Sequence, residues 1–180
     1  MLTIIRKSGL YSKEEISMME YAWISLRNDA IKILLICLLA YLTKTLKPCI
    51  FIMISFFSLR VFGGGLHRET FLGCLLSTML WMAVGVAMVL LLIRYSLSVA
   101  GCFLGVIGLG LSVSLGPIVS DKKKKITEEE RKRRKWIIAG IGGLLLIVPV
   151  FLPAKQVFGM SIYIGVFLEG IQILISKIKH

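Results

Sequence analysis

The sequence predicts an all-α, polytopic membrane protein, with about six transmembrane helices and an amphipathic helix before them. Apolar residues make up 57% of the chain and its mean hydropathy is +0.85, which exceeds the composition of ordinary soluble domains. Several apolar runs also approach the roughly 20 residues that a helix needs to cross a hydrocarbon core about 30 Å thick. We therefore treat residues 1–180 as a single membrane domain.

Residues 1–29 predict an amphipathic cytoplasmic helix rather than a signal peptide. Ser12 and Glu15 have the spacing of a capping box. Apolar residues then recur at helical spacing, at Ile16, Met19, Trp23, Leu26 and Ala30. Charged residues interrupt the continuous apolar core that a signal peptide requires. Two roles fit such a helix: it lies in the membrane interface, or it closes over a functional site.

The remaining apolar runs predict six spans and their orientation. They are Ile31–Leu46, Pro48–Phe62, Phe71–Ile93, Tyr95–Ser120, Trp136–Leu152 and Val157–Ile175. A dense basic loop, residues 121–135, separates the fourth run from the fifth, and the positive-inside rule places it in the cytoplasm. Counting spans from this loop places both termini and the Gly63–Thr70 connection on the cytoplasmic side of the cell membrane.

The formal net charge of +12 does not predict a nucleic-acid partner. The cations cluster between apolar runs instead of covering a soluble face, so they report orientation and contact with anionic lipid. The four cysteines show no CxxC spacing, which argues against a zinc site and a disulfide framework. We expect no metal and no cofactor.

Small and acidic residues inside the runs predict packing and one special position. Glycines that favour close helix packing occur at Gly101, Gly105, Gly140, Gly142 and Gly143. Glu169 lies inside the last run, where an acid is costly. Its side chain is expected either to reach the cytoplasmic interface or to face protein or a wet cavity.

The connection between the second and third runs carries the candidate catalytic residues, His67 and Cys74. Thr70 is placed to cap the following helix, which would put Cys74 in its first turn. A helix amino terminus and a neighbouring imidazolium both favour the thiolate, which is the nucleophilic form of cysteine. The other cysteines have no histidine within reach in the sequence and are interpreted as small buried apolar residues.

Geometry limits how His67 and Cys74 could meet. Seven residues along one straight helix correspond to a rise of about 10.5 Å, whereas proton exchange requires about 3 Å. The glycines at 63–65 permit backbone conformations that are closed to other residues. We therefore predict that His67 lies outside regular helix and folds back over the first turn.

At these residues the sequence resembles the accessory gene regulator B (AgrB) family. The resemblance rests on a motif formed by Arg60, Gly64, Gly65, His67, Cys74 and Ser77. It extends to the Glu20-Tyr21 pair, the Gly116-Pro117 step and the Lys-rich loop. Gly63 and Leu66 depart from the residues usual in the family, and neither change removes a reactive group.

The resemblance implies a membrane cysteine endopeptidase that acts on a small quorum-sensing peptide precursor (AgrD) with an acidic carboxy-terminal segment. It also implies a homodimer. Cys74 would form an acyl-enzyme and His67 would act as base and then acid, while the peptide closes into a thiolactone or lactone. Arg60 would hold the motif or bind a carboxylate. Glu69 and Ser77 are the candidates for orienting His67.

Two questions remain open at the level of the sequence. Arg131, Lys132, Arg133 and Arg134 lie in the basic loop, where Thr127 is placed to cap a short helix, and they either anchor to anionic lipid or dock the acidic precursor segment. The alternative functions are a small transporter or peptide exporter with Glu169 as a coupling site, and a noncatalytic membrane adaptor.

Overall fold

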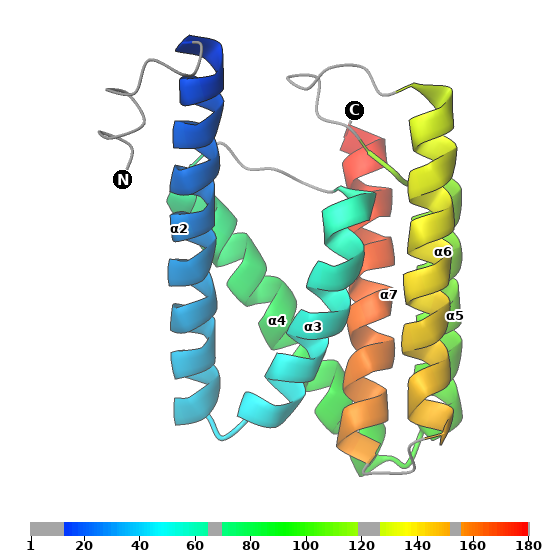
Figure 1. Ribbon diagram of the computed structural model, residues 1–180. Coiled ribbons are helices and arrows are strands. Elements are labelled where there is room, and N and C mark those ends of the chain that lie inside the picture. The colour runs from blue at the N-terminus through cyan, green and yellow to red at the C-terminus, as the bar shows by residue number, and fades with distance from the viewer. Residues whose placement is uncertain (1–12, 65–69, 119–126, 152–155, 180) are drawn as a thin grey trace. The chain divides into compact units, whose positions relative to one another are not determined.

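The structure is a computed structural model that describes residues 13–64, 70–118, 127–151 and 156–179. Within these ranges the chain forms six α-helices (Figure 1): α2 (Lys13–Leu42), α3 (Leu46–Gly63), α4 (Phe71–Arg94), α5 (Ser98–Leu115), α6 (Glu128–Phe151) and α7 (Gln156–Lys179). The all-helical prediction is confirmed. Five of these helices, α3 to α7, are long and apolar enough to cross a membrane, so this is a multi-pass membrane protein.

Two predicted elements of the amino-terminal part form a single helix. The chain divides into two compact units, Met1–Leu39 and Ala40–His180, which are described separately. Helix α2 is unbroken from Lys13 onwards because it contains neither glycine nor proline, so the expected amphipathic segment runs directly into the expected first span. The ammonium of Lys32 and the carboxylate of Asp29 pair at 2.8 Å near this junction. Ser12, the expected cap, lies outside the described residues.

The predicted boundaries agree with α3, α4 and α7 to within four residues. Helix α6 begins at Glu128, eight residues before the predicted start at Trp136, and the fourth run also differs. Helix α5 occupies only Ser98–Leu115 of the run Tyr95–Ser120. Its start is delayed because α4 ends in a tight turn in which Ser96 has a φ of 55° and Leu97 N–H donates to Leu92 O at 2.9 Å. Its end precedes the cis Gly116–Pro117 peptide bond.

Helix α7 is the centre of the unit Ala40–His180. Of its most apolar stretch 67% is buried, whereas the corresponding figures for α3 to α6 lie between 11% and 44%. It contacts α3, α4, α5 and α6, and in Figure 1 it lies among them. A helix with several buried faces needs close neighbours on each of them, so α7 fixes the positions of the other four.

Glycines make the contacts with α7 close. Gly170 faces Gly108 of α5, and a Cβ on Gly170 would lie only 2.7 Å from the Gly108 Cα. A Cβ on Gly165 would lie 2.8 Å from the carbonyl oxygen of Ile52 in α3 and would overlap the Ser55 hydroxyl. Small residues allow this backbone approach, which supplies the van der Waals contacts that hold helices together in lipid.

The glycine predictions are partly confirmed. Gly101 packs against Met160, Gly105 against Tyr163 and Leu146, and Gly142 against Leu109. Gly140 and Gly143 differ, because a Cβ on either would meet no described atom within 4 Å. These two glycines lie on a face of α6 that the described helices leave uncovered.

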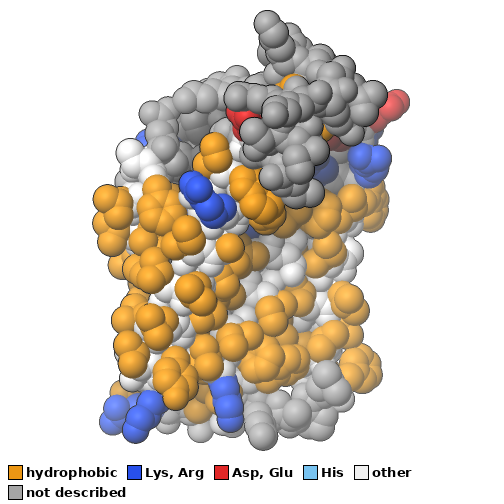
Figure 2. Space-filling view, turned by 60° about the vertical axis from the view of Figure 1, so that its left-hand side comes forward, with side chains coloured by type: hydrophobic (Ala, Val, Ile, Leu, Met, Phe, Trp, Pro, Cys, Tyr) orange, Lys and Arg blue, Asp and Glu red, His pale blue; other side chains and the backbone are white. Residues whose placement is uncertain are grey.

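The outer surface has the character of a membrane protein. On the face drawn in Figure 2, apolar side chains fill the middle, and Lys and Arg side chains lie towards the two ends. The exposed apolar residues include Leu76 and Leu80 of α4, at 64% and 65% exposure, and Phe103 of α5 at 65%. Apolar side chains so exposed are stable in contact with lipid chains.

We predict that Gly170→Ala destabilises the protein by about 1–3 kcal/mol, because the added methyl group overlaps the Gly108 backbone. Gly140→Ala is the matched control, since its methyl group meets no described atom and alanine is the better helix former by about 1 kcal/mol. Thermal unfolding in detergent micelles, followed by circular dichroism, measures both. Equal melting temperatures for the two variants would contradict the packing described for α7.

Candidate functional site

The candidate site lies at the end of the unit Ala40–His180 where α3, α5 and α7 finish and α4 and α6 begin. The backbone N–H of Ile118, after α5, donates to the carbonyl of Gly63 at 2.9 Å. The ammonium of Lys135, in α6, donates to the carbonyl of Ser114 at 3.3 Å. These bonds tie the end of α3 to the segment after α5, and the end of α5 to the start of α6.

Helix α4 begins as the sequence predicts and places Cys74 in its first turn. Thr70 is the N-cap, with an extended backbone, and its hydroxyl accepts a hydrogen bond from Gly73 N–H at 3.2 Å. Cys74 N–H donates to Thr70 O at 3.0 Å. The Cys74 side chain is half-buried. The thiol therefore lies near the positive end of the helix dipole, where an anion is favoured.

Gly64 ends α3 in a conformation that requires glycine. Its φ is 77°, and its N–H donates to Arg60 O at 3.0 Å. A Cβ at this position would overlap the carbonyl oxygen of Ile118. Both the positive φ and the close approach of another backbone exclude a side chain, which explains one glycine of the motif in physical terms.

Arg60 points to α7 from the last turn of α3. Its guanidinium donates a hydrogen bond to the Gln172 side-chain oxygen. The same group lies over the Phe56 ring, with its Cζ 5.5 Å from the ring centroid, in a cation–π arrangement. Of the two roles considered for Arg60, these contacts favour holding the motif in place.

Glu169 lies one turn before Gln172 on α7 and is fully buried, with 0% exposure. Its Oε1 lies 3.4 Å from where a Cβ on Gly63 would stand. Neither carboxylate oxygen has a hydrogen-bond partner among the described residues. Of the two expectations for Glu169, the side chain faces protein and does not reach the interface.

Gln172 was not a candidate in the sequence analysis. Its partner Arg60 lies 112 residues earlier in the chain, so no local pattern joins them. The sequence offers one sign that Gln172 matters. It lies three residues after Glu169, so the two polar groups share one face of a largely apolar helix.

The remaining motif residues are only partly described. Ser77 is half-buried on α4, one turn after Cys74. Gly65, His67 and Glu69 lie outside the described residues. The predicted approach of His67 to Cys74, and the prediction that His67 is not helical, therefore remain predictions.

The other cysteines occupy different environments. Cys49 is buried in α3, with its Sγ 4.0 Å from the Met53 sulfur, as expected for a small apolar residue. Cys37 in α2 and Cys102 in α5 are half-buried. None of Cys37, Cys49, Cys74 and Cys102 forms a disulfide.

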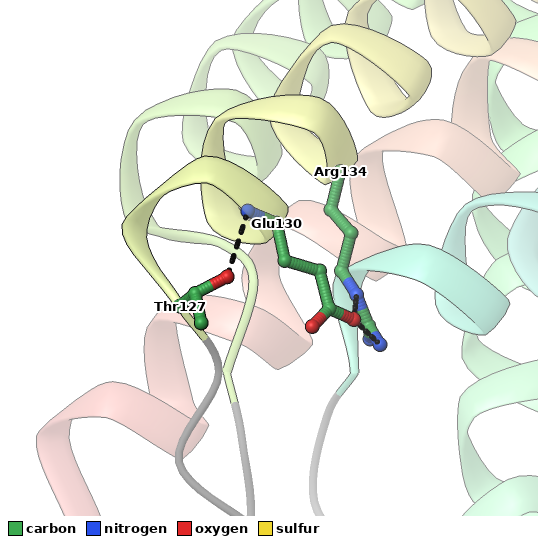
Figure 3. Close-up of polar contacts among 3 residues, drawn as sticks. All are labelled: Thr127, Glu130 and Arg134. Atoms are coloured by element: carbon green, nitrogen blue, oxygen red, sulfur yellow. Dashed lines mark hydrogen bonds and ion pairs between the residues drawn. The ribbon is translucent and has the colours of Figure 1, made fainter.

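The carboxy-terminal part of the basic loop forms the first turns of α6. Thr127 caps this helix, because its hydroxyl accepts from Glu130 N–H at 3.3 Å (Figure 3). The predicted cap is confirmed, but the predicted short helix is not, because α6 continues without a break to Phe151. The basic turns and the apolar span are one element.

The cations of these turns differ in their partners. Arg134 forms an ion pair with Glu130 at 2.7 Å (Figure 3), and Arg131 approaches Glu128 at 3.8 Å. Lys132 and Arg133 are exposed and have no acidic partner within the part of the chain that the structure describes. The two unpaired cations are the ones best placed to meet an external anion.

Comparison with known proteins agrees with the resemblance found in the sequence. The family model of accessory gene regulator B matches residues 1–173. The chain belongs to the accessory gene regulator B family. No curated protein and no solved structure matches it. Membership of the AgrB family associates the chain with the processing of autoinducing peptides.

For this AgrB chain we predict that Thr70→Ala slows alkylation of Cys74 about two- to fivefold, because it removes the cap that orders the first turn of α4. Thr70→Ser keeps the hydroxyl and should react at the original rate. The measurement is the rate of iodoacetamide labelling in a background with Cys37, Cys49 and Cys102 replaced by alanine. Identical rates for the alanine and serine variants would show that the cap does not influence the thiol.

Proposed function

We propose that this chain is a membrane cysteine endopeptidase that cleaves the carboxy-terminal part from a small quorum-sensing peptide precursor and promotes its thiolactone or lactone cyclisation. The observation that carries the proposal is the position of Cys74 in the first turn of a capped helix. The helix amino terminus directs its dipole and its unpaired backbone N–H groups towards a reacting group at this position. His67 precedes this helix in the sequence, within the motif by which the chain resembles the AgrB family.

The chemistry that we propose consists of two acyl transfers. The Cys74 thiolate attacks the scissile carbonyl, and His67 donates a proton to the leaving amine, which gives a thioester acyl-enzyme and a free carboxy-terminal peptide. A thiol or hydroxyl of the precursor, deprotonated by His67, then attacks the thioester. Cys74 leaves as a thiolate and the ring closes. A thioester retains the energy of the cleaved bond for this second step, provided that water is limited at the site.

The proposed orientation places the active site, both termini and the basic loop on the cytoplasmic side of the cell membrane, with α2 as a sixth span before α3 to α7. Alternation of α3 to α7 puts the motif, the basic loop and the end of α7 at one end of these helices. That end carries nine Lys and Arg residues between Lys122 and Lys135. Among the described residues of α3 to α7 and the turns next to them, the opposite end carries Lys44, Lys47 and Arg94. The positive-inside rule favours the first end for the cytoplasm.

The proposed substrate is an AgrD-like precursor with an acidic carboxy-terminal segment. The acidic segment would bind to the exposed cations of the first turns of α6, chiefly Lys132 and Arg133. Trp136 follows directly and is 78% exposed, as expected for an aromatic residue at a membrane interface. The cations before it are therefore expected at the membrane surface, where anionic lipid competes for them. We also propose a homodimer, as the family resemblance implies.

We predict that Cys74→Ala abolishes precursor cleavage and that His67→Ala slows it by about 10²–10⁴, the usual contribution of a general acid or base. Replacing Cys37, Cys49 and Cys102 together with alanine should leave cleavage intact. The assay is cleavage of purified precursor by purified protein in lipid vesicles, followed on a gel. Cleavage retained by Cys74→Ala would defeat the proposal and favour an exporter or an adaptor.

A second prediction concerns docking of the precursor. Lys132→Gln with Arg133→Gln should weaken binding of an acidic precursor about two- to tenfold, as expected for two exposed ion pairs. Arg131→Gln with Arg134→Gln is the matched control and should have a smaller effect, because these side chains pair with Glu128 and Glu130.

The Kd should be measured for an acidic and for a neutralised precursor at two salt concentrations. Screening by salt should reduce the difference between the parent protein and the variant. Equal losses for both precursors would indicate that the cations anchor lipid and do not read the acidic segment.

A further inference from the structure

The buried polar group formed by Arg60, Glu169 and Gln172 has no role in the chemistry proposed above. Glu169 is 0% exposed and Gln172 is 3% exposed, and both face the last turn of α3. Burying a carboxylate without hydrogen bonds is costly. An apolar side chain would fill the same space without that cost, so packing alone does not explain an acid at this position.

The group lies at the end of α3, within the motif. Arg60 donates to Gln172 of α7, and Gly63 lies against Glu169. The Gly63 carbonyl also accepts from Ile118 N–H at 2.9 Å. The last turn of α3 is thus held from two sides, by polar groups of α7 and by the backbone that follows α5.

We propose that Gln172 and Glu169 are positioning residues, which together fix the end of α3 from which the segment after Gly64 continues. This inference rests on the proposed peptidase function. Gln172 accepts the hydrogen bond that orients the Arg60 guanidinium, and the Glu169 carboxyl group packs against Gly63 in the last turn of α3.

The need for such an anchor follows from the separation of the two proposed catalytic residues. Cys74 is fixed by α4, which packs against α3 and α7 where Gly85 meets Ile52 and Leu168. His67 follows α3 by four residues. A misplacement of about 1 Å between reacting groups costs on the order of a hundredfold in rate. Because the two groups depend on different helices, the end of α3 must be fixed independently of α4.

Three variants separate positioning from general stability. Glu169→Gln keeps the shape and replaces the carboxyl group with an amide, and Gln172→Ala removes the acceptor for Arg60. Gln172→Glu keeps an acceptor oxygen and is the conservative rescue. Ser161→Ala is the matched control, because Ser161 is also buried on α7 but donates only within its own helix, to Val157 O at 2.5 Å.

The measurements are kcat and KM for precursor cleavage in vesicles and the alkylation rate of Cys74. We expect Glu169→Gln and Gln172→Ala to lower kcat about tenfold or more, with KM within about twofold of the parent value. Alkylation should be unchanged, because α4 does not depend on the anchor. Gln172→Glu should recover most of the kcat lost in Gln172→Ala, and Ser161→Ala should match the parent protein.

The outcomes distinguish this inference from the proposed function. If the parent protein does not cleave precursor, the proposed function fails first. If it cleaves and both Glu169→Gln and Gln172→Ala retain the parent kcat, the anchor is refuted. A rise in KM alone would assign the group to substrate binding and also refute it. If Glu169→Gln does not insert into the membrane, the kcat values of Gln172→Ala and Gln172→Glu test the proposal without it.

Discussion

The close approach of α7 to its neighbours is the constraint on which the rest of the structure depends. Backbone meets backbone where Gly170 faces Gly108, and Gly165 makes room for Ser55 of α3. Lipid chains are as apolar as leucine, so helix association in a membrane relies on such contacts more than on the hydrophobic effect. Because α3 and α5 both pack against α7, their ends lie close together. The segment that follows Gly64 starts from this place.

The buried acid and amide of α7 lie towards one end of the bundle. Glu169 and Gln172 are on the half of α7 that leads to Lys177 and Lys179, and Gln172 accepts a hydrogen bond from Arg60 near the end of α3. Polar groups near a helix end lie closer to water than groups at the middle of a span, which limits the cost of burying them in a membrane.

Much of the fold follows from local patterns, and most of the polar anchor does not. Hydropathy located α3, α4, α6 and α7, and local cap chemistry located Thr70 and Thr127. The union of the first two predicted elements into α2 was missed because a change from amphipathic to apolar character need not interrupt a helix. Gln172 was missed because its bond to Arg60 joins residues far apart in sequence. Close packing at Gly140 and Gly143 was wrongly expected, since sequence spacing alone does not say which side of α6 faces other helices.

Because α6 is one unbroken helix, its basic turns are already ordered before a substrate binds. Its eight residues from Glu128 to Lys135 project about 12 Å beyond Trp136 at 1.5 Å per residue. They continue a helix whose Ile138 and Gly142 are buried in the bundle. A precursor that binds these turns would meet a preformed helical surface, not a tether that must be ordered at the moment of binding. Less conformational freedom is lost in that case, so weak ionic contacts yield more affinity than they would on a flexible loop.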